Sequence, residues 1–372
     1  MKKQLTVLLS GLLLLSSLAA CQSGSSPSAT TTTATATTAE AEQATTADSA
    51  AATTAAAESS QTAAASEEEI DASTLKVAAI FGGAINDGNW NETQYNGLKQ
   101  IEEEGASIAY LENVGDTDAA QAARDYASSG YQLIYLTTNS YQDYCLPVAA
   151  DFPDTTFVSI NGTVNQDNYI SVRIADEQQG FMMGLIAALL SESGKVGFVG
   201  GLEINPIKLG SSGFQQGVDY ANQNYGLSVE AKRINTGSFT DVNQAKETAI
   251  SLIEDGCDVV TPMANDAGVG VMEAAEEKGA TAIASGIGQE TSAPTATAVT
   301  VVKDVAVAYT ETFKAYRNHT LSGSSTVETF GANKGVVYLT DWLTDASQEV
   351  KDRVTEVMDQ LANGEIDIDL TI

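Results

Sequence analysis

From Leu75 to the end of the chain, short apolar runs alternate with longer segments whose apolar residues recur every three or four positions. Short apolar runs bounded by turn residues predict buried strands, and the longer periodic segments predict helices. Strands and helices are therefore expected to alternate along this part of the chain. The expected strands are residues 76–81, 107–111, 132–137, 156–160, 169–174, 195–199, 228–234, 258–262, 281–285, 298–302 and 335–339.

Helices are expected between these strands, and the ends of several are visible in the sequence. A helix over residues 90–104 places Leu98 and Ile101 on one face and stops at Gly105, a residue type that commonly follows a helix. A helix over residues 241–254 begins at an aspartate that is suited to cap it. Two further helices, each followed by glycine, are expected over residues 267–278 and 347–363.

Alternation of this kind is typical of parallel sheets that are covered by helices on both faces. The pattern restarts at Lys195, after the polar turn at residues 191–194, and the body is long enough for two domains of about 150 residues each. The sequence therefore predicts an α/β fold with two doubly wound lobes. In such sheets ligands bind beyond the carboxyl ends of the strands, so binding residues are expected in the loops that follow strands.

The first part of the chain differs in composition from the body. Residues 1–20 carry two lysines followed by a short apolar stretch, which is typical of a secretory signal peptide. Residues 18–21 (Leu-Ala-Ala-Cys) resemble the bacterial lipobox, so Cys21 is the expected lipidation site. Residues 21–74 consist almost entirely of Ala, Thr, Ser, Glu and Gln after the cysteine, which predicts a disordered tether with an r.m.s. span of about 40 Å.

Charge and composition exclude several classes of function. The chain has 49 acidic and 18 basic side chains and a net charge of −31, so it lacks the basic surface that nucleic-acid binding requires. Its one histidine, His319, excludes most zinc sites and any Ser-His-Asp catalysis that does not use this residue. Walker, Rossmann and Gly-x-Ser-x-Gly patterns are missing, so neither a cofactor nor a metal is expected. Cys145 and Cys257 form no metal or redox motif and are expected to be unpaired.

The loop after the first expected strand offers the clearest binding chemistry. It contains Asn86, Asp87, Trp90 and Asn91, so amide and carboxylate groups lie next to an indole at the start of a helix. Trp90 can be a core anchor or a platform for a flat ligand, and Asp87 can instead cap the helix. The residues alone leave these alternatives open.

Motifs spread over the whole body match one family in the same order. The matching segments are residues 85–91 (Ile-Asn-Asp-Gly-Asn-Trp-Asn), 95–98 (Tyr-Asn-Gly-Leu), 194–201 (Gly-Lys-Val-Gly-Phe-Val-Gly-Gly), 205–208 (Asn-Pro-Ile-Lys), 213–218 (Gly-Phe-Gln-Gln-Gly-Val), 236–239 (Thr-Gly-Ser-Phe), 268–275 (Gly-Val-Gly-Val-Met-Glu-Ala-Ala) and 363–366 (Asn-Gly-Glu-Ile). On these motifs the chain resembles the basic membrane protein family of ABC-transporter substrate-binding lipoproteins, which includes the purine-nucleoside receptors.

The resemblance implies a type I periplasmic-binding-protein fold, in which two doubly wound parallel-sheet lobes are joined by a multi-strand hinge. The first lobe is expected to comprise residues 75–190 and about 286–320, and the second residues 191–285 and about 321–372. The expected partners are a small-molecule ligand and an ABC permease with its ATPase. The protein is expected to be a monomer outside the cytoplasm, held to the membrane only through lipidated Cys21.

In the receptors of this family, two aromatic side chains enclose the ligand and acidic groups bind its polar edges. The resemblance places Trp90 at the first aromatic position, which is usually Phe, and makes Phe239 the candidate from the second lobe. Asp176 falls near an acidic position, with Glu177 as the alternative, and Lys303 matches a lysine near the sugar. The full set of candidate ligand-binding residues is Phe81, Asn86, Asp87, Trp90, Asn91, Tyr141, Asp176, Glu177, Phe239, Asn265, Gly286 and Lys303.

Two departures from the family pattern concern the sugar. Many relatives have an aspartate where this chain has Phe81, and two more where it has Gly286 and Gly288. Carboxylates bind ribose hydroxyls through charge-assisted hydrogen bonds that are each worth about 1.5–3 kcal/mol. Their absence argues against the usual riboside contacts, so a free nucleobase or another small heteroaromatic or amphipathic molecule is also a candidate ligand.

The leading hypothesis is therefore a receptor that captures a purine nucleoside or a nucleobase-like molecule for an ABC importer. A ligand sensor that acts on a signalling partner shares all of these sequence features. A hydrolase or oxidoreductase on the same scaffold is disfavoured, because the motifs for a nucleophile with its base or for a dinucleotide are missing and His319 is expected at an exposed helix end.

Overall fold

The computed structural model describes residues 68–323 and 327–372. The expected signal peptide, the lipidation site Cys21 and the expected tether up to residue 67 lie outside these residues. The two lobes described below belong to one compact unit of the chain. No helix within the described ranges is both long enough and apolar enough to cross a membrane.

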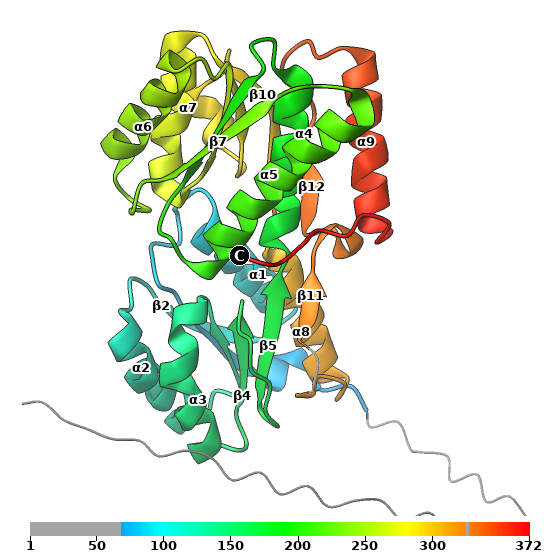
Figure 1. Cartoon of the computed structure of the whole chain (residues 1–372). Coiled ribbons are helices and arrows are strands. Elements are labelled where there is room, and N and C mark those ends of the chain that lie inside the picture. Colours follow the sequence, from blue (N-terminus) through cyan, green and yellow to red (C-terminus); the bar gives the residue numbers. More distant parts are fainter. Residues whose placement is uncertain (1–67, 324–326) are drawn as a thin grey trace, which may run out of the picture. The chain divides into compact units, whose positions relative to one another are not determined.

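The first lobe contains a six-stranded parallel sheet (Figure 1). Its strands are β1 (Lys76–Ile80), β2 (Ser107–Leu111), β3 (Leu133–Leu136), β4 (Thr156–Ile160), β5 (Tyr169–Ile174) and β11 (Glu328–Phe330), in the spatial order β11-β5-β4-β3-β1-β2. Helices α1 (Trp90–Glu103) and α8 (Ala306–Arg317) cover one face, and α2 (Asp116–Ser128) and α3 (Gln142–Asp151) cover the other. Successive residues of β1 join opposite cores, Val77 with α1 and Ala78 with α2, which explains why this strand is apolar throughout.

The second lobe repeats this plan (Figure 1). Its strands are β6 (Lys195–Gly200), β7 (Glu230–Asn235), β8 (Val259–Met263), β9 (Thr281–Ala284), β10 (Thr297–Lys303) and β12 (Val337–Leu339), in the spatial order β12-β10-β9-β8-β6-β7. All neighbours are parallel except β12, which runs antiparallel to β10. One face is covered by α4 (Asp176–Leu190), α5 (Asn205–Tyr225) and α9 (Gln348–Ala362), and the other by α6 (Val242–Glu254) and α7 (Gly268–Lys278). Short 3-10 helices are η1 (Ala72–Thr74), η2 (Asn139–Tyr141), η3 (Asn265–Ala267), η4 (Gln289–Ser292) and η5 (Ala332–Lys334).

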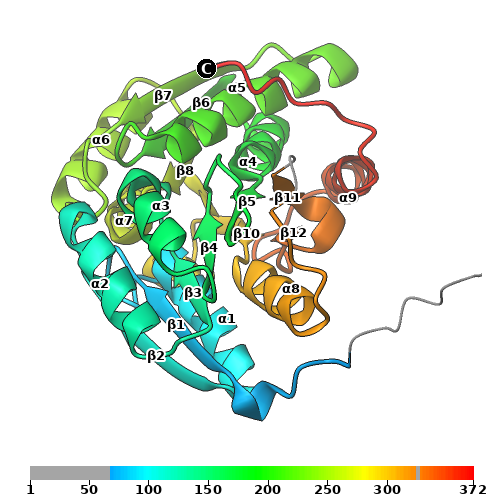
Figure 2. The same ribbon diagram turned by 90° about the horizontal axis from the view of Figure 1, so that it is seen from below.

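The chain passes between the two lobes in three described segments. These segments join β5 to α4, β10 to α8, and β11 to β12. The second passage returns the chain to the first lobe, where α8 packs against α1 although the two helices are far apart in the sequence (Figure 2). The architecture is the expected type I periplasmic-binding-protein fold, with a hinge of several segments.

The lobe boundaries differ from those expected at residues 190 and 286. Helix α4 packs along α5 and lies over the second sheet, so the first passage comes immediately after β5. Strand β10 pairs with β9, so the second passage follows Lys303. The periodic pattern shows where a helix lies along the chain, but the partner against which its apolar face packs is set by the tertiary fold.

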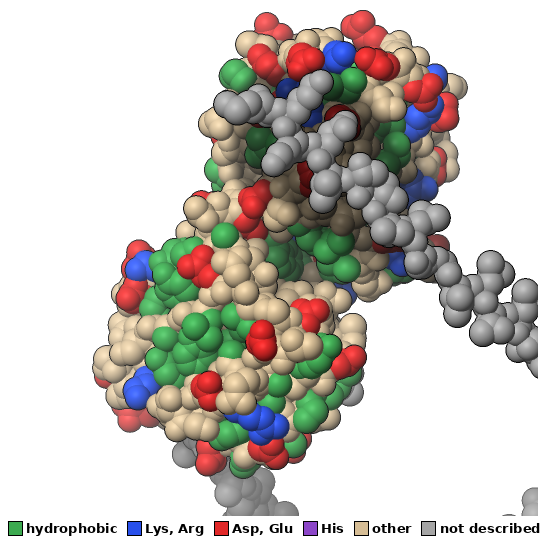
Figure 3. Space-filling model, turned by 90° about the vertical axis from the view of Figure 1, so that its left-hand side faces the viewer, with side chains coloured by type: hydrophobic (Ala, Val, Ile, Leu, Met, Phe, Trp, Pro, Cys, Tyr) green, Lys and Arg blue, Asp and Glu red, His purple; other side chains and the backbone are tan. Residues whose placement is uncertain are grey.

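Each expected strand is present in the structure, whereas the sequence analysis missed β11. This strand has only three residues, Glu328–Phe330, which is too short to show a strand pattern. On the face of the molecule shown in Figure 3, acidic side chains are scattered over both lobes rather than gathered in one patch. Cys145 and Cys257 are both free and buried.

Helices α4 and α5 pack closely because glycines line their contact. These are Gly180 and Gly184 on α4 and Gly210, Gly213 and Gly217 on α5. A Cβ atom at Gly184 would overlap the carbonyl oxygen of Phe214, and one at Gly180 would overlap that of Gly210. The two backbones can approach this closely only because neither helix has side chains at these positions.

We expect Gly184→Ala to lower the free energy of unfolding by about 1–3 kcal/mol, because the added methyl forces two backbones apart. At a solvent-exposed position inside a helix, the same change would instead stabilise the protein by up to about 1 kcal/mol. Gly82→Ala is the matched control, since its new Cβ would meet its nearest neighbours, Thr138 and Tyr141, at an ordinary 3.5 Å. Urea denaturation measures both variants, and equal stability of Gly184→Ala and the wild type would contradict this account of the helix contact.

Candidate functional site

A cavity of about 670 Å³ lies between the two lobes. The loops that line it follow β1, β2, β3 and β4 of the first lobe and β6, β7 and β8 of the second. All of them leave the carboxyl ends of their strands, where ligands bind in sheets of this kind. The expected residues that line the cavity are Asp87, Trp90, Asn91, Asp176, Phe239, Asn265 and Lys303.

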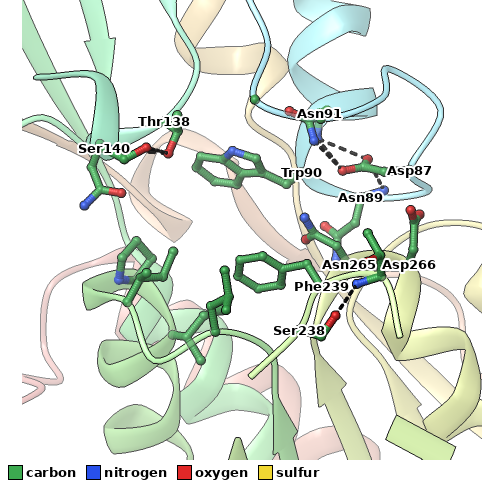
Figure 4. A pocket seen from close by; sticks show the side chains of 18 of the residues that line it. Asp87, Asn89, Trp90, Asn91, Thr138, Ser140, Ser238, Phe239, Asn265 and Asp266 are labelled. Carbon is green, nitrogen blue, oxygen red and sulfur yellow. Dashed lines mark hydrogen bonds between the residues drawn. The ribbon is translucent and has the colours of Figure 1, made fainter. Parts of the chain in front are cut away.

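Two aromatic rings, one from each lobe, face one another across the cavity (Figure 4). Trp90 is the first residue of α1, and its Nε1 atom donates a hydrogen bond of 2.9 Å to the carbonyl oxygen of Thr137, which fixes the indole. Phe239 follows β7 and packs on Gly201, where any Cβ atom would overlap the phenyl ring. Trp90 is therefore both partly buried against the core and a wall of the cavity.

A buried ion pair joins two of the passages between the lobes and reaches the cavity wall. The Lys303 Nζ atom lies 2.5 Å from Oδ1 of Asp176, and the two side chains are 7% and 1% exposed. The other oxygen of Asp176 accepts a hydrogen bond of 3.0 Å from Nδ2 of Asn161. Lys303 also lies over the Trp90 ring, 5.1 Å from its centroid, in the geometry of a cation–π contact. Lys303 thus contacts both Asp176 at the hinge and the Trp90 ring in the cavity.

Asp87 has the helix-capping role that the sequence left open. Its carboxylate accepts hydrogen bonds from the backbone N–H groups of Asn89, Asn91 and Glu92 at the start of α1. The Nδ2 atom of Asn91 donates a further hydrogen bond of 2.8 Å to it. Asp87 therefore positions the loop that carries Trp90, and the Asp87 side chain also lines the cavity.

The other expected ligand-binding residues do not line the cavity. The Phe81 ring is buried and packs edge-on against Tyr95 and Tyr110 in the first lobe, because this position faces the apolar core. Tyr141 is buried and donates a hydrogen bond of 2.6 Å to the carbonyl oxygen of Val114, so it supports a lining loop from behind. Glu177 forms two hydrogen bonds with Arg173.

Asn86 and Gly286 also lie outside the lining. Asn86 is exposed on the loop after β1. Gly286 lies at a contact between the lobes, where Asn89 of the first lobe donates a hydrogen bond of 3.3 Å from Nδ2 to Oγ of Ser285. The two loops occupy the space that a side chain at residue 286 would need.

Several polar residues of the lining were missed by the sequence analysis. They are Asn89, Asn113, Asp116, Thr138, Asn139, Ser140, Asn161, Ser238, Thr240 and Asp266. Nearly all follow a strand, so the rule that ligands bind at strand ends could have included them. Asn161 directly follows β4 and has a positive φ of 59°, a conformation that asparagine adopts more readily than most residues.

Asp266 differs from the other acidic residues of the cavity in its electrostatic environment. Burial raises the pKa of its carboxyl group, and the nearby negative charge of Asp87 raises it further. Since Asp87 belongs to the first lobe and Asp266 to the second, the two carboxylates repel one another across the cavity.

We expect Asp266→Asn to raise the free energy of unfolding at pH 7, and the gain to disappear as the pH falls towards 4. A carboxyl group with a raised pKa binds its proton more tightly in the folded state, so wild-type stability falls as the pH rises above the ordinary value of 3.8. The gain should be less than about 1 kcal/mol, because solvent screens this partly exposed group. Urea denaturation at pH 7 and pH 4 measures it, and a variant less stable than the wild type at pH 7 would refute the repulsion.

A cavity of this size, lined from strand ends and lying between two α/β lobes that a multi-segment hinge joins, is typical of two-lobed solute-binding proteins. The chain belongs to the Bmp family, because the family model described as "ABC transporter substrate-binding protein PnrA-like" matches residues 74–369. The resemblance seen in the motifs is thereby confirmed. The family is one of solute-binding proteins rather than enzymes.

The similar proteins include basic membrane proteins, a transcriptional activator and solute-binding proteins of ABC transporters. Basic membrane protein A of Borreliella burgdorferi is 26% identical over 298 residues, which are 78% of this chain and 86% of that protein. Transcriptional activator protein med of Bacillus subtilis is 27% identical over 289 residues, 76% of this chain and 87% of its own length. The crystal structure of an ABC transporter solute-binding protein from Aeropyrum pernix has the same fold, with a TM-score of 0.70 and 23% identity over 79% of this chain and 92% of that one.

Proposed function

We propose that this protein captures a small flat heteroaromatic molecule, a purine nucleoside or a free nucleobase, and delivers it to an ABC importer. The observation that carries the proposal is the pair of rings, Trp90 and Phe239, which face one another from opposite lobes (Figure 4). A ring bound between them would stack on both faces, and base–aromatic stacking is worth about 1–3 kcal/mol per contact.

The size and polarity of the cavity agree with such a ligand. Its volume of about 670 Å³ is within the range of small-molecule sites, which is roughly 300–1,000 Å³. Polar side chains surround the two rings, with those of Asp87, Asn89, Asn265 and Asp266 on one side and those of Thr138 and Ser140 on the other (Figure 4). A ligand with an apolar face and a polar rim suits this arrangement.

The residues at the two family aspartate positions disfavour a ribose in the ligand. The position of Gly286, where the family pattern has an aspartate, is filled by the loop contact between Gly88, Asn89 and Ser285. Phe81, at the other aspartate position, is turned into the core. A nucleobase without its ribose loses nothing from these replacements.

Delivery would follow from closure of the lobes around the ligand. Two-lobed receptors close by a hinge motion, and the closed form is the one that a permease can recognise. We place the protein outside the cytoplasm as a monomer, anchored through lipidated Cys21, with an ABC permease and its ATPase as partners. Labelling of the expressed protein with a radioactive fatty acid, compared with a Cys21→Ala variant, tests the anchor.

A ligand sensor is the second candidate, because one of the similar proteins, transcriptional activator protein med of Bacillus subtilis, carries the name of a regulator. The cavity serves either role. Uptake of the labelled ligand by cells with and without the gene distinguishes them, since a sensor would leave uptake unchanged.

A thermal-shift panel of purine and pyrimidine bases and nucleosides is the direct test of ligand class. A ligand at one hundred times its dissociation constant stabilises the folded state by about 2.7 kcal/mol, which raises the melting temperature by several degrees. We expect at least one purine compound to produce this shift. If no member of the panel changes the melting temperature, the heteroaromatic ligand is refuted while membership of the solute-binding family stands.

A further inference from the structure

Among the side chains that line the cavity, four carry carboxylates, and three of these have partners within the protein. They are Asp87, Asp116, Asp176 and Asp266. Asp87 is held by N–H groups of α1, Asp116 accepts a hydrogen bond from Oγ of Ser140, and Asp176 is paired with Lys303. No described residue donates a hydrogen bond to the Asp266 carboxylate or forms an ion pair with it. The Asp266 carboxylate can therefore accept hydrogen bonds from a ligand that enters the cavity.

Asp266 lies beside the expected place of a flat ligand. It belongs to η3, directly after β8, and it lies with Asp87, Asn89 and Asn265 on the same side of the Trp90 and Phe239 rings (Figure 4). A ring bound between the two aromatic side chains would present one edge to this group of residues.

The neighbouring strand cannot supply a carboxylate at this edge. A Cβ atom at Gly286, after β9, would lie 2.8 Å from the carbonyl oxygen of Gly88 and 3.1 Å from Cγ of Asn89. Strands β8 and β9 are adjacent and parallel, so the loops that follow them lie next to one another. At this edge of the cavity, the second lobe therefore supplies its carboxylate from Asp266, which follows the neighbouring strand β8.

The position of Asp266 also determines which chemical groups it favours. Its carboxylate is an acceptor only, and it faces the negative charge of Asp87 across the cavity. A ligand N–H group at this place gains a charge-assisted hydrogen bond, whereas a ring acceptor there is repelled by both carboxylates.

We propose that Asp266 is a specificity-determining residue that accepts a hydrogen bond from an N–H group on the edge of the bound ring. The residue then selects amino-substituted rings over analogues that lack the donor. The inference rests on the proposed function, because it assumes a ring between Trp90 and Phe239. It adds to that function a single residue that distinguishes ligands by the groups on one edge of the ring.

Isothermal titration calorimetry on the full chain tests the proposal with pairs of ligands that differ by one amino group. The pairs are adenosine and purine riboside, adenine and purine, and guanosine and inosine. In at least one pair we expect the wild type to bind the amino compound at least tenfold more tightly. Asp266→Ala should weaken binding of that compound at least tenfold and binding of its partner less than threefold.

Two further variants complete the design. Asp266→Asn keeps an acceptor oxygen without the charge, so its affinity for the amino compound should fall between those of the wild type and Asp266→Ala, and it keeps the test open if the alanine variant does not fold. Asp345→Asn removes an exposed carboxylate outside the cavity and should bind as the wild type does.

The outcomes separate this inference from the proposed function. If the wild type binds these compounds but Asp266→Ala keeps the same preference within each pair, the role of Asp266 is refuted and the proposed function stands. If the wild type binds no member of any pair, the purine ligand itself fails, and the inference fails with it. If the wild type prefers the amino compound and Asp266→Ala loses that preference, the result supports both the proposed function and the role of Asp266.

Discussion

Lys303→Ala is expected to lower the free energy of unfolding by about 3 kcal/mol or more. The change leaves the carboxylate of Asp176, which is 1% exposed, without its cation. Breaking a buried ion pair from one side typically costs about 3–5 kcal/mol, because the remaining charge stays desolvated. The hydrogen bond from Asn161 and the position of Asp176 in the first turn of α4 offset part of the cost, so the lower end of that range is expected. Urea denaturation followed by circular dichroism measures the effect.

An exposed ion pair provides the matched control. Lys99 and Glu102 on α1 also form an ion pair, but each side chain is 43% exposed. Lys99→Ala should therefore change stability by no more than about 0.5 kcal/mol. The double variant Asp176→Asn with Lys303→Met should recover most of the loss, because it leaves no buried charge. If Lys303→Ala is as stable as Lys99→Ala, the pair does not stabilise the hinge.

Trp90→Ala is expected to weaken binding of the tightest compound in the ligand panel at least tenfold. The change removes one of the two rings that face the cavity, and with it a stacking contact worth about 1–3 kcal/mol. A tenfold loss corresponds to about 1.4 kcal/mol, near the lower end of that range. The donor to the Thr137 carbonyl is lost as well, so the loop after β1 is less firmly held. Titration calorimetry gives the dissociation constants.

Two conservative variants show whether the aromatic face is what matters. Trp90→Phe keeps a flat ring, as in the family pattern, and should bind within about threefold of the wild type. The chain has two tryptophans, so Trp342→Phe leaves Trp90 as the only indole whose fluorescence responds to ligand. Equal affinity of Trp90→Ala and the wild type would show that the ligand does not stack on this ring.

Much of the fold could be predicted from the sequence because local patterns determine it. Residues 76–80 form β1 where an apolar run was visible, and α1 ends at Glu103, two residues before the glycine that marked its end. The lobe boundaries could not be predicted in the same way. The chain changes lobe inside short segments such as the one between β5 and α4, and no change of composition marks these passages. Only the packing of α4 on α5 assigns that helix to the second lobe.

The candidate site, too, could be predicted from the sequence only in part. The sequence determined that Trp90, Asp87 and Asp176 lie at strand ends or helix starts, and it identified the family through motifs that span the body. Only the tertiary structure decided that Phe81 points into the core, that Gly286 lies against the loop of Asn89, and that Asp266 lines the cavity. The reason is physical: a residue's place along a strand follows from local periodicity, but its neighbours across the cavity come from segments far away in the chain, which only the folded packing of two lobes brings together.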